Sequence, residues 1–189
     1  MDLQDYSGDY KPDLKLEDLS KEALIKLVKI NSKDFIELGG IWHTYVGKKY
    51  GYDVANDFTW QMWVGKDPVV MDHDLKRILP AFKIEGDDIA SIFKYLQLTP
   101  AVGCYNYEHE VEFKNKNHAI MTITHCPSLL RFEKYNVPKA AKFGCELDIV
   151  YLQNVANRFN PKIKVKCLTP LPRKSPGDVP CAWEFKLVE

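Results

Sequence analysis

Apolar residues recur every three or four positions along the first hundred residues, the spacing of amphipathic helices. Residues 1–16 show no such period, and we expect them to form a loose arm. Ser20 is a suitable N-cap for a first helix, and Ser32 for a second helix that Gly51 would end. Further helices are predicted at 53–65, 73–79 and 87–98.

The pattern changes after Thr99-Pro100 to alternation with a period of two, which is typical of strands. Two β-prone runs separated by KNKN indicate a hairpin, whose first run places these residues on one face: Tyr105, Tyr107, His109, Val111 and Phe113. A long helix is predicted from about Pro138 to Phe159, followed by alternating runs at 162–167 and 181–187.

These elements predict an α+β fold, in which a helical N-terminal half is followed by a β-β-α-β-β antiparallel sheet covered by the long helix. One domain is expected over 17–189, with its helical part at 17–98 and its sheet part at 99–189.

Composition narrows the class of protein. With 26 basic and 26 acidic residues the formal charge is zero, which argues against nucleic acid or a charged membrane surface as a partner. The polar, acidic start does not resemble a signal peptide, and no apolar run reaches the roughly 20 residues of a membrane span. We therefore expect a cytoplasmic protein, and its aromatic-rich helices make a homodimer a reasonable expectation.

Five cysteines are the most informative residues for chemistry. Cys167 ends one predicted strand and Cys181 begins the next, so we expect them to be cross-strand neighbours. Cys145 on the long helix and Cys126 could reach the same place, and four thiolates suit a tetrahedral zinc. Asp148, His125 or Glu184 could replace one thiol in this set. Because there is no CxxC motif, plain buried thiols remain the alternative.

Two further groups of residues could carry function. Cys126 next to His125 could be a nucleophile, but neighbours on a strand point to opposite faces, so its base would come from elsewhere, for example His109 or His118. In the helical half, an apolar pocket with one polar group could be lined by Trp42, His43, Trp60 and Trp63. Ordinary core packing is the alternative for this second group.

The C-terminal half resembles a known family. The segments CPSLLRFEKY, GCELDIVYLQNVANRF and PCAWEF are similar to the L-2-amino-thiazoline-4-carboxylate hydrolase-like family of small bacterial and archaeal proteins. The order of elements and cysteines also resembles the 4-vinyl reductase domain, in which cysteines and a glutamate hold zinc. Here Lys164 stands at the place of that glutamate, which leaves the fourth ligand to Cys126, Asp148 or Glu184.

The resemblance implies binding of a small molecule and hydrolysis of an amide-like or sulfur- and nitrogen-containing ring. Such hydrolysis would use a metal-activated water or a cysteine nucleophile. Two other functions stay open at this point. One is a non-catalytic ligand sensor or carrier with a structural zinc, and the other is a redox protein that holds an iron–sulfur cluster.

Overall fold

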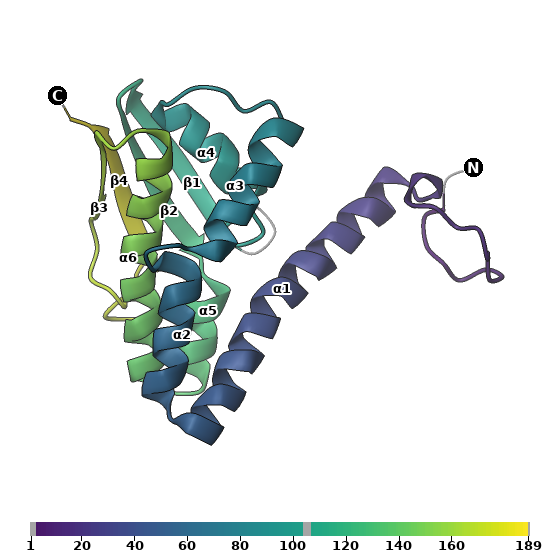
Figure 1. Cartoon of the computed structure of the whole chain (residues 1–189), viewed down its shortest axis with the longest axis horizontal. Helices are drawn as coiled ribbons and strands as arrows, with labels where there is room; N and C mark the ends of the chain where they lie inside the picture. Colours follow the sequence, from purple (N-terminus) through teal and green to yellow (C-terminus); the bar gives the residue numbers. More distant parts are fainter. Residues whose placement is uncertain (1–2, 104–106, 189) are drawn as a thin grey trace.

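The chain folds into a four-stranded antiparallel sheet with helices packed against one face (Figure 1). The computed structural model describes residues 3–103 and 107–188. The strands, in the spatial order β1-β2-β4-β3, are β1 (Glu108–Asn115), β2 (His118–His125), β3 (Ile163–Cys167) and β4 (Cys181–Leu187). The helices are α1 (Lys21–Tyr50), α2 (Tyr52–Val64), α3 (Val69–Ala81), α4 (Ile89–Leu98), α5 (Pro127–Lys134) and α6 (Pro138–Phe159).

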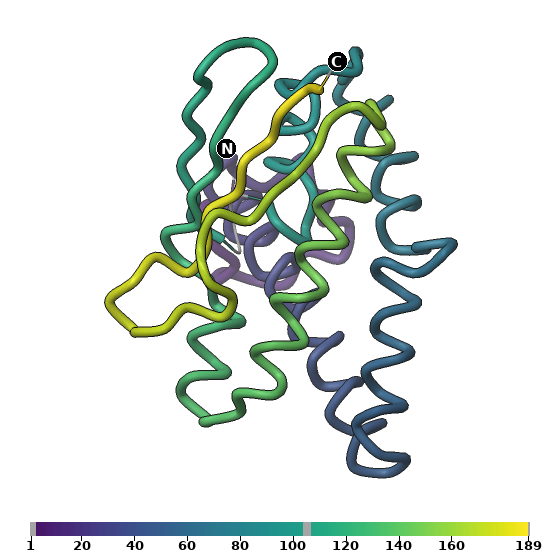
Figure 2. The backbone as a smooth tube through the Cα atoms, turned by 90° about the vertical axis from the view of Figure 1, so that its left-hand side faces the viewer, coloured from purple at the N-terminus to yellow at the C-terminus, as the bar shows by residue number. Residues whose placement is uncertain are grey.

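This architecture confirms the predicted α+β class, its helical first half and its long covering helix. Figure 2 shows the layers from the side, with the sheet on the left, α6 next to it and α2 beyond α6. Among the helices of the described ranges, none combines the length and the apolar character that crossing a bilayer requires.

Alternation along the strands creates the two different faces of the sheet. Met121 of β2 lies opposite Trp183 of β4, and both side chains are almost completely buried beneath the helices. On the other face, His118 Nε2 lies 2.9 Å from Glu184 Oε1, and the glutamates of β1 are exposed. The expected shared face of β1 holds for His109, Val111 and Phe113, and Tyr107, just before the strand, packs against the same core. Tyr105 lies outside the described residues.

Helix α1 differs from the prediction of two successive helices. Ser20 is its N-cap as expected, because its hydroxyl accepts a hydrogen bond from Ala23 N at 3.2 Å. Gly51 ends it with a φ of 94°. Ser32, however, lies inside this helix, which continues through it without a break, and its side chain is buried. The helix is therefore about 45 Å long, and its N-terminal half stands away from the sheet (Figure 1).

The other elements depart from expectation mainly at their ends. Helix α3 begins at Val69, whereas the predicted helix begins at residue 73. Pro68 precedes it, and the fixed φ of proline suits the start of a helix. The short helix α5 was not predicted, because its eight residues are too few for a clear apolar period. In the N-terminal arm, Leu3 forms a bridge with Leu19, and a 3-10 turn spans Leu16–Asp18.

Candidate functional site

Four cysteines from four different elements converge on the helix-covered face, at the end of the sheet where β4 begins. Cys126 caps α5, Cys145 lies on α6, Cys167 ends β3 and Cys181 begins β4. All four are free thiols, and we call them the thiol cluster. The thiols are close enough for the charge on one to act on others: Cys126 and Cys167 both disfavour the ionised form of Cys145 and of Cys181. The remaining cysteine, Cys104, lies outside the described residues.

The register of β3 and β4 corrects one expectation. Cys167 lies opposite Trp183, and Cys181 lies opposite Ile123 of β2, so the two cysteines are not directly opposed. The long loop between the strands is not a tight turn and does not fix the register at its ends. Pairing continues beyond β3, where Leu168 N donates to Ala182 O at 2.8 Å. The two thiols are consequently diagonal neighbours on one face, with a Cβ separation of about 7 Å.

Cys126 is held as the N-cap of α5, where its sulfur accepts a hydrogen bond from Leu129 N at 3.4 Å. A helix N-terminus normally favours the thiolate. Burial is the larger effect here and raises the pKa of Cys126 to about 11, although the main-chain N–H groups of α5 act in the opposite direction. The Cys126 thiol is therefore neutral at pH 7.

The histidines near Cys126 lie on different faces of the sheet. His125 is exposed, in agreement with the expectation that it points away from Cys126. His118 pairs with Glu184 on the other face and is therefore not a base for this thiol. His109 lies on the cluster face, since it pairs with Ile123 of β2, and its Nδ1 is buried with no hydrogen-bond partner among the described residues. Of the two candidate bases, His109 is the one on the correct face.

Cys145 and Cys181 are also protonated at neutral pH. Burial, together with the nearby Asp148, raises the pKa of Cys145 to about 12. Burial likewise raises the pKa of Cys181 well above that of a free thiol, although Trp183 Nε1 donates a hydrogen bond to its sulfur at 3.1 Å and opposes this shift. Cys126, Cys145 and Cys181 are therefore uncharged at neutral pH and react slowly as nucleophiles in this state.

Asp148 is the carboxyl group of the site. It lies on α6 one turn after Cys145, and burial alone raises its pKa to about 7. Within the described ranges, no group donates a hydrogen bond to it or forms an ion pair with it. A half-buried carboxyl without a partner costs stability, and such groups concentrate at functional sites. Asp148 is thus an available acceptor for a cation or a hydrogen-bond donor.

An arginine in the loop between β3 and β4 anchors that loop beside the cluster. The guanidinium of Arg173 donates to both carboxylate oxygens of Glu133 on α5, at 2.8 and 2.7 Å, and to Asp178 O at 2.9 Å. Only 8% of the Arg173 side chain is exposed. Its charge also favours the thiolate of Cys126. Sequence reasoning missed Arg173, because nothing in a Pro/Gly-rich loop indicates which residue pairs with α5.

Replacing Arg173 by alanine is expected to lower the free energy of unfolding by about 2 kcal/mol, because it leaves Glu133 without its bidentate partner. Release of the loop should also speed the reaction of Cys126 with an aromatic disulfide reagent several-fold. Urea denaturation and thiol labelling followed by mass spectrometry measure the two effects. Arg173→Lys keeps the charge but not the bidentate geometry, so it should show an intermediate effect. Equal stability of all three proteins would contradict this role.

The residues predicted to line a ligand pocket do not share one. Trp42 is on the surface, edge-to-face with Phe58 at 6.0 Å. His43 binds Asn56 Oδ1 at 2.8 Å between α1 and α2. Trp60 and Trp63 pack against the core instead, so these four residues divide between surface and core.

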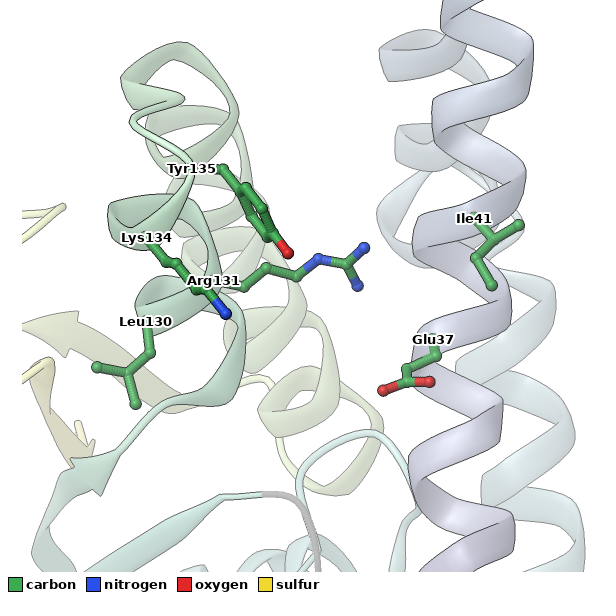
Figure 3. Close-up of a pocket in the computed structure, with 6 residues that line it drawn as sticks. All are labelled: Glu37, Ile41, Leu130, Arg131, Lys134 and Tyr135. Atoms are coloured by element: carbon green, nitrogen blue, oxygen red, sulfur yellow. The ribbon is translucent and has the colours of Figure 1, made fainter.

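Two surface hollows are both formed with α1. One, of about 450 Å³, lies between α1 and α5 and is lined by Glu37, Ile41, Leu130, Arg131, Lys134 and Tyr135 (Figure 3). The other, of about 360 Å³, lies along α1 itself. Neither hollow contains a tryptophan or a cysteine in its lining.

The residue types of the thiol cluster are those that bind a soft metal, but their present positions do not form a complete coordination site. Among the described residues, no three His, Cys, Asp or Glu side chains already stand in a group that could hold a metal ion. Glu184 is on the opposite face, paired with His118, and cannot serve as the fourth ligand. Cys126 and Asp148 remain as partners for the other three thiols.

Together, the fold and the site define a small α+β protein with a half-covered antiparallel sheet and a partly buried cluster of thiols and one carboxyl group. The chain belongs to DUF6125, a family of unknown function, whose family model matches residues 16–187. No curated protein and no solved structure matches the chain.

Proposed function

We propose that the thiol cluster binds a soft metal ion, with zinc as the first candidate. The observation that carries the proposal is the convergence of Cys126, Cys145, Cys167 and Cys181 from four separate elements onto one end of the sheet. Thiolates are the ligands that zinc and iron–sulfur clusters prefer. A reducing cytoplasm, where we place the protein, would keep the thiols available for a metal.

Metal binding would require the thiols to lose their protons and to move closer together. Rotation of cysteine side chains supplies part of this movement, and the loop that Arg173 anchors can supply more. The present neutral cluster is the form expected without metal, because burial and mutual repulsion both oppose thiolates there. Bound zinc reverses this preference, since it stabilises the thiolate form directly.

The proposed enzymatic form of this function is hydrolysis of a small amide-like or sulfur- and nitrogen-containing ring. In that form three thiols would hold the metal and leave an open position, where zinc supplies a Lewis acid. Asp148, with a pKa near 7, is suited to hold or release a proton beside it. The resemblance to the L-2-amino-thiazoline-4-carboxylate hydrolase-like family supports this form. A site closed by four thiolates would instead be the structural zinc of a ligand sensor or carrier.

Metal analysis of protein purified without oxygen tests the proposal. We expect about one zinc per chain, and less than about a tenth of that in the Cys145→Ser/Cys181→Ser variant. His125→Ala, a change at an exposed imidazole, should keep its zinc and serves as the matched control. Circular dichroism verifies that each variant is folded.

The other outcomes are equally informative. Iron with sulfide in place of zinc would overturn the zinc assignment in favour of the iron–sulfur alternative. A folded wild-type protein without bound metal, and without uptake of added zinc, would leave the cysteines as core packing. For a zinc-loaded protein, X-ray absorption separates four sulfur ligands, expected for the structural form, from three sulfurs and an oxygen, expected for the catalytic form.

A further inference from the structure

Helices α1 and α2 form an antiparallel hairpin that exposes a row of large apolar side chains. We call this surface the hairpin face; it consists of Phe35, Leu38, Trp42 and Tyr45 of α1 and Val54, Phe58 and Met62 of α2. Leu38 is 66% exposed and Tyr45 is 70% exposed, values that are unusual for side chains of this size.

The side chains of the hairpin face form one continuous surface across both helices. Trp42 lies edge-to-face against Phe58 with 6.0 Å between ring centroids, and Phe35 against Trp63 at 6.1 Å. The hollow of about 360 Å³ along α1 includes Phe35 and Leu38. These contacts fix the aromatic rings in place before any partner arrives, which limits the entropy lost on association.

The area of the hairpin face matches one side of a homodimer interface. From their exposed fractions, the seven side chains present about 600 Å² of apolar surface. A standard interface buries about 800 Å² on each partner, and in homodimers about 65% of it is apolar. Monomers seldom expose a continuous apolar patch larger than about 600 Å².

The charges beside the hairpin face are arranged for a second copy of the same chain. Asp34 and Lys48 lie on the same edge of α1, each seven residues, or about two turns, from Ile41. If two α1 helices pack antiparallel about a two-fold axis at Ile41, Asp34 of each copy meets Lys48 of the other. Both side chains are exposed, and neither makes an ion pair within the described part of its own chain.

We propose that the hairpin face binds a second copy of this chain, with α1 antiparallel to α1 and α2 antiparallel to α2. The result is a two-fold symmetric arrangement of four helices, closed by two Asp34–Lys48 pairs at its edges. This interface is independent of the metal proposed for the thiol cluster. The sheets of the two copies lie outside it.

Sedimentation equilibrium of the full chain tests the interface. We expect a dimer at micromolar concentration and at least 100-fold weaker association for Leu38→Glu, which places two charges at the centre of the interface. Because Leu38 is already exposed, this variant should fold normally and keep its circular dichroism spectrum. Phe82→Glu, at an apolar residue 60% exposed after α3, is the matched control and should dimerise normally.

Charge reversal tests the antiparallel register. Asp34→Lys and Lys48→Asp should each weaken the dimer about tenfold, because each change places like charges together at both edges. The double variant should restore the wild-type affinity. A wild-type chain that stays monomeric at about 100 μM, a concentration at which even a weak dimer forms, would overturn the proposal. A dimer that Leu38→Glu leaves intact would also overturn it, and failure of the double variant to recover would overturn the register centred on Ile41.

Discussion

Replacing Asp148 by asparagine is expected to stabilise the metal-free protein at pH 8 and to leave its stability at pH 4 almost unchanged. Burial raises the pKa of Asp148 to about 7, whereas in the unfolded chain it titrates near the ordinary value of 3.8. Between these values the folded protein binds the proton and the unfolded chain does not. The contribution of Asp148 to stability is therefore fully present below pH 4 and is lost as the pH rises through 7.

The expected gain of Asp148→Asn at pH 8 is as much as about 4 kcal/mol, because asparagine has the same shape and no charge to bury. Urea denaturation of chelator-treated, reduced protein at pH 4, 6 and 8 measures it. Asp67→Asn, at an exposed aspartate, is the matched control and should change little at any pH. A gain that is equal at pH 4 and pH 8 would show that the Asp148 carboxylate is not held in a buried environment.

Replacing Trp183 by alanine is expected to cost about 4 kcal/mol of the free energy of unfolding. Trp183 is 2% exposed at the centre of the sheet, with Met121 opposite it on one side and Cys167 on the other. Its loss creates a cavity in the core between the sheet and the helices, and it removes the indole N–H that donates a hydrogen bond to Cys181 Sγ.

Trp183→Phe separates these two effects. Phenylalanine retains most of the volume, so we expect a loss of about 1–2 kcal/mol, while the pKa of Cys181 rises further without its donor. Urea denaturation gives the stabilities, and the rate of thiol alkylation as a function of pH gives the ionisation of Cys181. Similar stability of Trp183→Ala and the wild type would contradict the packing described for β4.

The sequence predicts the elements of this fold well wherever one period dominates. The alternation in residues 163–167 and 181–187 locates β3 and β4, and the apolar pattern of 138–159 locates α6. Prediction from the sequence fails where the boundaries of an element depend on tertiary contacts. Ser32 has the chemistry of a cap, but α1 continues through it because the next turns also pack on α2.

The candidate site was predictable as a set of residues but not as a geometry. Cysteines on alternating strands and on a helix that covers them must lie near one another, so the cluster follows from the sequence pattern. The register of β3 against β4 does not follow from the sequence pattern. The loop between these strands is too long to fix it, so it depends on how Trp183 and its neighbours pack. The roles of Arg173 and of the Trp183 indole could not be predicted, since both depend on partners far away in the chain.

The raised pKa values of the thiols explain why metal binding should be coupled to proton release. The pKa of Cys126 is about 11 and that of Cys145 about 12, and burial raises the pKa of Cys181 as well. All three thiols carry protons at pH 7. A metal that binds them as thiolates must displace those protons.

Calorimetric titration of reduced, metal-free protein with zinc, repeated in buffers of different ionisation enthalpy, measures this coupling most directly. We predict stoichiometric binding of one zinc with release of at least three protons per zinc at pH 7, and loss of both in Cys145→Ser/Cys181→Ser. Absence of saturable binding, or binding and proton release that this variant leaves unchanged, would contradict a metal site at the thiol cluster.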